Sequence, residues 1–143
     1  MRKVKELLAT RSQPVAAVGT QETVFEAAKK MKDRRIGALV VTDGASVVGI
    51  FTERDVLYRI VADGKDPKTT LIETVMTSPV ACCTTDTSLV ECRNVMRDKK
   101  IRHLPVVDEN KLAGIVSLRD LVDHEIDEQQ ETIHYLNEYL YGG

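Results

Sequence analysis

The 143-residue sequence has no tryptophan, few aromatic residues of any kind (4%) and only three cysteines. It also has no long apolar run, because stretches such as residues 37–41 are far too short to cross a bilayer. Residues 1–11 carry basic charge, but no apolar segment follows them, which does not fit a signal peptide. We therefore expect a cytoplasmic protein without a membrane segment.

A surplus of charge of one sign is missing as well. The net charge is −2 and the isoelectric point is near 5.9. A dedicated nucleic-acid binder needs a basic face for phosphate contacts, so nucleic acid is an unlikely partner. Hydrophobic residues make up 43% and charged residues 29% of the chain, which is typical of a globular protein.

The three cysteines do not indicate a disulfide framework or a metal site. Their number is odd and no secretory signal accompanies them. Cys82 and Cys83 are adjacent, so on a strand they point to opposite faces, which suits chelation poorly. Cys92 aligns with Ala27 of an internal repeat, which predicts a small buried position. We expect no metal site.

The internal repeat is the clearest feature of the chain. Residues 14–57 align without a gap with residues 79–122. About a third of the aligned positions are identical, too many in register for chance. The identical pairs include Pro14/Pro79, Glu26/Glu91, Met31/Met96, Ile36/Ile101, Asp43/Asp108, Gly49/Gly114 and Asp55/Asp120. We expect two repeats, residues 1–66 and 67–126, followed by a helical extension over residues 127–143.

Each repeat is predicted to fold as strand, helix, strand, strand, helix, which gives an α+β fold. The helix of each repeat follows a capping-box pattern, Thr23 to Glu26 or Ser88 to Glu91, in which hydroxyl and carboxylate cap each other's N–H. Polar turns separate the second and third strands. The predicted strands are 15–18, 38–41 and 47–51 in the first repeat, and 80–83, 104–107 and 112–116 in the second. Each repeat is small, so we expect the two sheets to pack together as one unit.

The last segment has apolar residues at alternating spacings of four and three, the seam of a heptad pattern. The seam residues are Val122, Ile126, Gln129, Ile133, Leu136 and Leu140. Either this helix packs on its own domain or it pairs with a second chain. The spacing favours the second interpretation, and we expect a homodimer.

Both repeats end their third strand with the same pattern, Gly49-x-x-Thr52-x-x-Asp55 and Gly114-x-x-Ser117-x-x-Asp120. A hydroxyl followed three residues later by an acid is also an ordinary helix N-cap. The pattern nevertheless recurs with a basic residue, Arg54 or Arg119, before the acid. A carboxylate at such a place can accept two hydrogen bonds from a ribose diol.

At these motifs the chain resembles the CBS domain family, in particular the stand-alone CBS pair. The resemblance covers residues 14–126 and depends on the tandem copies, on the run Ile101 to Asp108, and on the two Gly-x-x-Thr/Ser-x-x-Asp endings. It implies a pseudo-two-fold pair of repeats with clefts that bind adenosyl compounds such as AMP, ATP, NAD or S-adenosylmethionine. No further cofactor is implied.

The resemblance also implies which residues line each cleft. In the first cleft, Thr52 and Asp55 are expected to contact the ribose, and the strand around Ala81 and Cys82 the adenine. Arg102 and His103 are expected to lie near the phosphate. The second cleft is expected to use Ser117, Asp120, Ala16, Ala17, Gly37 and Ala38. It lacks a basic pair at the matching positions, although Arg54 or Arg119 could redistribute charge between the clefts. We therefore expect the first cleft to bind the more highly charged ligand.

The sequence is compatible with two functions. The first is a regulatory module that senses adenine nucleotides, and the alternative is a structural dimerisation protein without a functional ligand. An enzyme is poorly supported, because no nucleophile with a base, metal-ligand set or phosphate-binding glycine loop is present. Arg34 and Arg35 are interpreted as a solvated helix end, where the helix dipole favours positive charge.

Overall fold

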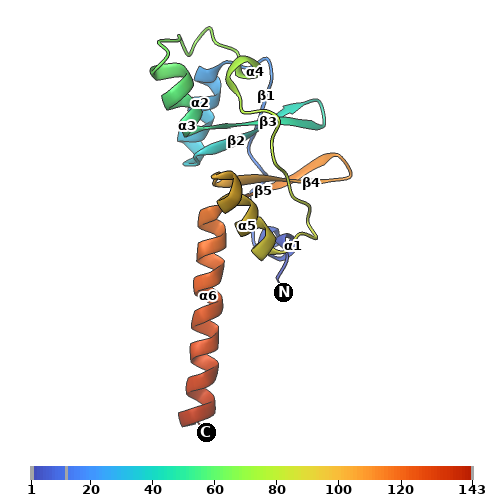
Figure 1. Cartoon of the computed structure of the whole chain (residues 1–143), viewed down its shortest axis with the longest axis vertical. Helices are drawn as coiled ribbons and strands as arrows, with labels where there is room; N and C mark the ends of the chain where they lie inside the picture. Colours follow the sequence, from blue (N-terminus) through green and yellow to red (C-terminus); the bar gives the residue numbers. More distant parts are fainter. Residues whose placement is uncertain (1, 12, 143) are drawn as a thin grey trace.

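The computed structural model describes residues 2–11 and 13–142. Two small α+β halves lie one above the other, and a long helix projects from the lower half (Figure 1). Within these residues, no helix is both long and apolar enough to cross a membrane. The predicted α+β class and pair of repeats are confirmed.

The first half is built on a three-stranded sheet in the order β1-β2-β3. β1 is parallel to β2, and β2 is antiparallel to β3. Its elements are β1 (Ala17–Gly19), α2 (Val24–Arg34), β2 (Ala38–Asp43), β3 (Ser46–Thr52), α3 (Glu53–Asp55), a π-helical turn η1 (Val56–Val61) and α4 (Ile72–Val75). A short helix α1 (Val4–Leu8) precedes them in the sequence. The core residues of its sheet, such as Leu39 and Phe51, are completely buried.

The second half repeats this plan with a reduced sheet. Its elements are α5 (Leu89–Lys99), β4 (His103–Asp108), β5 (Lys111–Ser117), α6 (Leu118–Asn137) and a terminal π-helical turn η2 (Glu138–Gly142). The predicted strand 80–83 is present only as a single bridge between Cys83 and Val106. Pro105 stands where the first half has Val40, whose N–H donates to Ala16. Proline has no N–H, so this ladder cannot extend back along residues 80–82.

The predicted helix caps form only in part. Thr23 and Ser88 accept from the N–H groups of Glu26 and Glu91, at 3.2 and 3.1 Å. The reciprocal bonds from the two glutamates are not found in the described residues. The first N–H of each helix is satisfied by another segment, since Val24 N–H donates to the carbonyl of Thr70 and Leu89 N–H to that of Arg2.

Each half is completed by the segment that precedes the other half in sequence. Val4 and Leu7 of α1 lie in the core of the second half, with Cys92 and Leu104. Ile72 and Val75 of α4 lie in the core of the first half. The packing therefore crosses the boundary at residue 66 that the repeat suggested, and the two halves are tied together by their lead-in segments.

The cysteines occupy the positions expected from their place in the repeat. Cys92 is completely buried in the second core. Cys82 is exposed whereas its neighbour Cys83 is buried, as expected for adjacent residues in extended chain. The pKa of the Cys83 thiol is raised, first by its hydrogen bond with Cys92 and then by burial.

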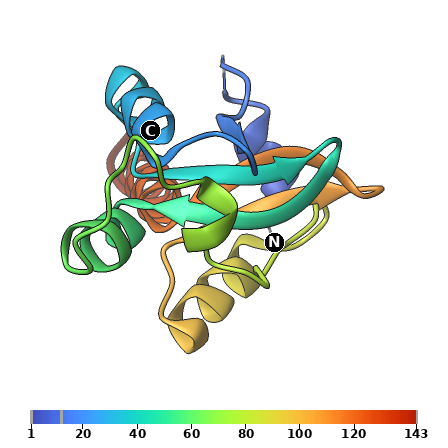
Figure 2. The same ribbon diagram turned by 90° about the horizontal axis from the view of Figure 1, so that it is seen from above.

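The two sheets face each other across the pseudo-two-fold interface. β3 of the first half contacts both β4 and β5 of the second. Seen from above, the two hairpins lie over one another with the helices outside them (Figure 2). The expectation that the repeats pack as one unit is confirmed.

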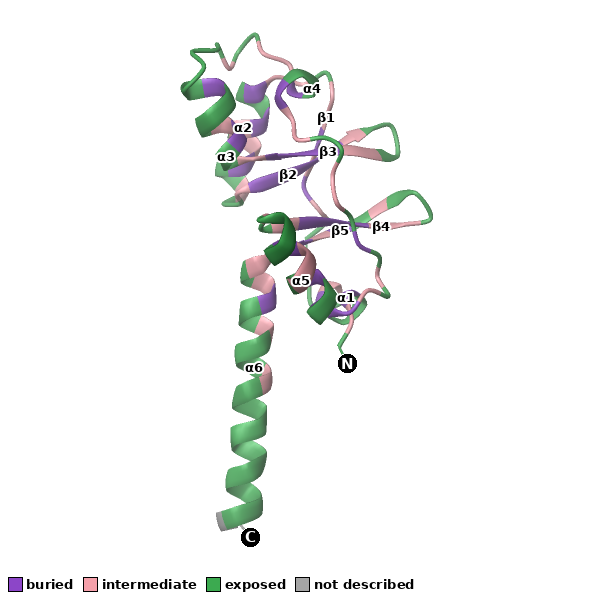
Figure 3. Ribbon diagram, in the orientation of Figure 1, coloured by how far each residue is buried: buried purple, intermediate pink, exposed green. Residues whose placement is uncertain are grey.

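Most of α6 has no packing partner among the residues that the structure describes. Leu121 is buried, but beyond the first turns the helix is exposed along its length (Figure 3). Ion pairs from Arg93 to Glu125 and from Arg2 to Glu128 and Glu131 join α6 to the rest of the chain. The alternative in which this helix packs back on its own domain is therefore wrong, and Tyr135 and Tyr139 are exposed as well.

Candidate functional site

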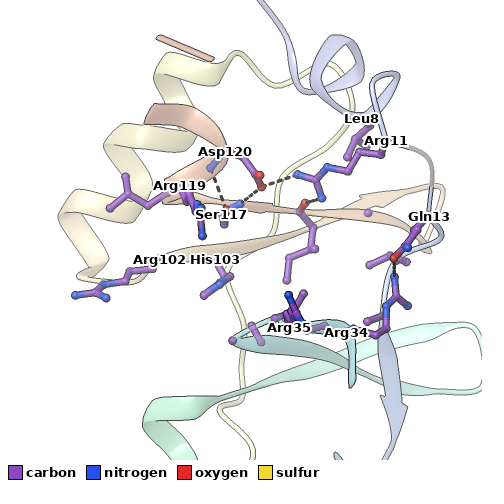
Figure 4. Close-up of a pocket in the computed structure, with 18 of the residues that line it drawn as sticks. Leu8, Arg11, Gln13, Arg34, Arg35, Arg102, His103, Ser117, Arg119 and Asp120 are labelled. Carbon is purple, nitrogen blue, oxygen red and sulfur yellow. Dashed lines mark hydrogen bonds and ion pairs between the residues drawn. The ribbon is translucent and has the colours of Figure 1, made fainter. Parts of the chain in front are cut away.

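A cleft of about 1300 Å³ opens between the two halves, beside the start of α6 (Figure 4). Its walls come from the α1–β1 linker, the end of α2, the first residue of β2, and the β5–α6 junction. Ser117 and Asp120 lie on one wall, and Ala16, Gly37 and Ala38 lie on the other. The structure thus brings together five of the residues expected in the second cleft.

Ser117 and Asp120 form a complete capping box at the start of α6. The Asp120 N–H donates to Ser117 Oγ at 3.0 Å, and the Ser117 N–H donates to Asp120 Oδ2 at 2.8 Å. This box holds the carboxylate at the helix N-terminus, where the helix dipole stabilises negative charge. The Asp120 side chain is still 31% exposed, so the box leaves it accessible from the cleft.

Arg11 of the α1–β1 linker reaches across to this box. Its Nη2 lies 2.5 Å from Asp120 Oδ2, and its Nη1 donates to the carbonyl oxygen of Ile115 at 2.9 Å (Figure 4). The guanidinium thereby joins the linker to both β5 and α6. Arg11 was not among the predicted site residues, because the lead-in of the first repeat does not align with that of the second.

The corresponding box of the first half is closed. Asp55 is only 6% exposed, and Thr77 donates through its hydroxyl to Asp55 Oδ1 at 3.1 Å. The backbone of Thr77 also pairs with Ile50 in both directions. A Cβ on Gly49 would lie 2.7 Å from Met76 Sδ, which shows how tightly residues 76–77 cover this strand.

Arg102 and His103 do not lie where we expected them. Both line the cleft that contains Ser117 and Asp120, close to Gly37 and Ala38. The sequence placed them with Thr52 and Asp55, but residues 76–77 cover that box. The expected division of charge between the clefts is therefore wrong, and the open cleft is the basic one.

Further positive charge comes from the end of α2. Arg34 and Arg35 lie at the solvated end of α2, as the sequence predicted, and both also line the cleft. Arg34 Nη2 donates to the Pro14 carbonyl at 2.6 Å. Arg35 ends the helix in a left-handed conformation (φ 54°), which turns the chain into the cleft wall. These arginines could not be assigned to the cleft from the sequence, because their place there depends on how the α1–β1 linker and α2 pack around it.

Charges within the cleft are unequal. Five arginines line it (Arg11, Arg34, Arg35, Arg102 and Arg119), against two carboxylates, Glu53 and Asp120. Burial lowers the pKa of His103; the nearby carboxylates oppose this shift and Arg102 adds to it. His103 is therefore neutral near pH 7 and can act as a hydrogen-bond donor or acceptor.

Besides Thr52 and Asp55, four further predicted residues lie outside the open cleft. The guanidinium of Arg54 stacks over the ring of Tyr58 at 5.1 Å, and the Ala17 carbonyl accepts from Lys30. Ala81 packs against the second core, and Cys82 is exposed. In the described part of the chain, no group of three His, Cys, Asp or Glu side chains could hold a metal ion.

Comparisons with known proteins agree with this architecture. The model of the CBS domain matches residues 4–62 and 72–127. The CBS domain-containing protein YhcV of Bacillus subtilis is 36% identical over 126 residues, which are 88% of this chain and 87% of that protein. CBSX3, a mitochondrial CBS domain-containing protein of Arabidopsis thaliana, is 35% identical over 87% of this chain. The chain spans 63% of CBSX3.

Solved structures show the same fold. A putative signal-transduction protein with CBS domains from Burkholderia ambifaria superposes with a TM-score of 0.85 at 35% identity, covering 90% of this chain and 96% of that one. A CBS domain protein from Pyrobaculum aerophilum, complexed with AMP, gives a TM-score of 0.74 at 27% identity, with 83% and 89% covered. CBS domain proteins of this kind are generally non-catalytic. The chain belongs to the CBS domain family and carries two CBS domains in tandem.

Proposed function

We propose that this protein is a non-catalytic regulatory module that binds an adenosine nucleotide in the cleft beside Ser117 and Asp120. One observation carries the proposal: a capped, accessible carboxylate faces a cleft that five arginines line. The carboxylate suits the hydroxyls of a ribose, and guanidinium groups suit the oxygens of a phosphate. A nucleotide presents both groups in one molecule.

The walls of the cleft suit a flat base as well. Ala16 and Ala38 are small and buried, and Gly37 has no side chain. Together they offer a smooth surface on the side opposite Asp120. A relative of the same fold binds AMP. AMP, ATP, NAD and S-adenosylmethionine share the adenosine half, and the basic cleft favours the members that carry phosphate.

A thermal-shift screen tests the proposal. A ligand that binds only the folded protein raises the free energy of unfolding by RT ln(1 + L/Kd), where L is the free ligand concentration. We expect AMP, ATP or NAD to raise the melting temperature, and S-adenosylmethionine, which has no phosphate, to raise it less. The same screen with Asp120→Asn should give a smaller shift in melting temperature. If none of these compounds stabilises the protein, the proposal fails.

We further propose that two copies of the chain pair through α6. Five apolar seam residues are between 44% and 63% exposed (Val122, Ile126, Ile133, Leu136 and Leu140). The charged residues Asp127, Glu128 and Glu131 lie outside the seam. Such a row has a heptad spacing that a second identical helix can cover. In a dimer, ligand-dependent changes at the start of α6 would reach the partner along this helix.

A further inference from the structure

The guanidinium of Arg11 makes the same two contacts in the open half that residue Thr77 makes in the closed half. Thr77 N–H donates to the carbonyl of Ile50, and its hydroxyl donates to Asp55. Arg11 Nη1 donates to the carbonyl of Ile115, and Nη2 pairs with Asp120. Ile115 and Asp120 are the repeat counterparts of Ile50 and Asp55. In the open half, the side chain of Arg11 thus makes the contacts that the backbone and hydroxyl of Thr77 make in the closed half.

The difference between backbone and side chain matters for access. In the closed half, residues 76–77 hold their place through main-chain bonds in both directions with Ile50. In the open half, Arg11 and Asp120 each remain 31% exposed. A single flexible side chain can swing away by rotation of its χ angles, without moving the sheet. The Asp120 carboxylate is therefore covered by a removable group.

We propose that Arg11 determines the specificity of the cleft by guarding the ribose carboxylate. A ligand reaches Asp120 fully only when it takes the guanidinium away. A nucleotide can do this, because its phosphate is a new anionic partner for Arg11. A nucleoside without phosphate also breaks the ion pair between Arg11 and Asp120, but it offers Arg11 no anionic partner in exchange. This inference rests on the proposed function and adds a reason for the cleft to reject uncharged ribosides.

The surroundings support this exchange. Arg34 is bound to the Pro14 carbonyl and to Gln13, so the linker on the far side of Arg11 is anchored to α2. Arg34 and Arg35 line the same cleft as Arg11. A phosphate there can bridge several guanidinium groups through bidentate hydrogen bonds.

Calorimetric titration of adenosine and AMP into the wild type and Arg11→Gln tests the inference. The ratio of the two dissociation constants is the measured quantity. We expect Arg11→Gln to bind adenosine more tightly and AMP more weakly. The preference for AMP should therefore shrink by about tenfold or more, the effect of one charge-assisted hydrogen bond. Arg11→Lys keeps the charge but cannot span both partners, so its ratio should lie between the two.

Arg97→Gln is the matched control, because it removes one positive charge from an exposed side chain of α5, outside the cleft. It should leave the ratio unchanged. If Arg11→Gln keeps the ratio of the wild type while its melting temperature is normal, Arg11 is only a structural link and the inference is overturned. If it changes the ratio no more than Arg97→Gln does, general charge explains the effect. If neither compound binds any variant, the proposed function itself fails.

Discussion

Thr77 donates its hydroxyl proton to Oδ1 of Asp55 at 3.1 Å, while the backbone of Thr52 donates to Oδ2 of the same carboxylate at 3.0 Å. Asp55 is thereby satisfied on both oxygens, and it is almost completely buried. Its counterpart Asp120 is accessible and receives its bonds at Oδ2 from Ser117 and Arg11. The same motif has a buried, structural carboxylate in one repeat and an accessible carboxylate, a candidate binding group, in the other.

This division predicts different effects on stability. Asp55→Ala removes a cap and leaves buried donors without an acceptor, so it should lower the free energy of unfolding by about 2–3 kcal/mol. Asp120→Ala removes a partly exposed cap, and its cost should be about 1 kcal/mol. Urea denaturation of the ligand-free proteins measures both. Equal losses in the two variants would contradict the division.

A second prediction concerns the ribose. If Asp120 accepts from the ribose hydroxyls, the protein should bind AMP more tightly than 2′-deoxy-AMP. The loss of one hydrogen bond to a charged group corresponds to about ten- to a hundredfold in affinity. Calorimetry with the two compounds gives the ratio directly. The control is Asp120→Asn, in which the preference should be much smaller; an equal affinity in the wild type would show that Asp120 is a cap only.

His103 makes stability depend on pH. Burial, with a smaller contribution from Arg102, lowers its pKa in the folded protein, against the opposing effect of Glu53 and Asp120. As pH falls through about 6.5, the unfolded chain takes up the proton first, so the folded state loses stability until pH reaches the lower folded pKa. We expect the free energy of unfolding to fall more steeply in this window for the wild type than for His103→Gln. Urea denaturation at a series of pH values compares the slopes, and identical slopes would exclude this role of His103.

The seam on α6 predicts the state of association. Ile133→Lys combined with Leu136→Lys places charge on a row that a second helix should cover, and it should convert a dimer into a monomer. Asp127→Lys introduces the same charge outside the seam and should leave the dimer intact. Light scattering measures the mass, and circular dichroism checks that both variants fold. A monomeric wild-type protein would end the idea.

Local sequence signals predicted much of this fold. Strand alternation and the repeated N-cap hydroxyls located the strands and helices, and the aligned positions showed that there are two halves. The exchange of α1 and α4 between the halves could not be predicted this way. Val4 and Ile72 have the apolar character of core residues in either half, and only the three-dimensional packing decides which core they join.

The Gly-x-x-Thr/Ser-x-x-Asp motif was predicted from the sequence, whereas several other residues that line the open cleft were not. Ser117 and Asp120 follow from the repeat, because both copies carry the same pattern. Arg11 lies in a lead-in that is longer than its counterpart, so no alignment of the repeats pairs it with Thr77. The extra length lets a side chain take the place of the backbone, and this one difference opens one cleft while the other stays closed.

A calorimetric titration of AMP into the wild type, Asp55→Asn and Asp120→Asn tests most directly whether Asp120, and not Asp55, contacts the ligand. Asparagine can still cap a helix, so each variant changes the charge with little disturbance of the fold. We expect AMP to bind the wild type and Asp55→Asn with similar affinity, and Asp120→Asn to bind it about tenfold or more weakly. Binding that survives Asp120→Asn but disappears in Asp55→Asn would contradict it.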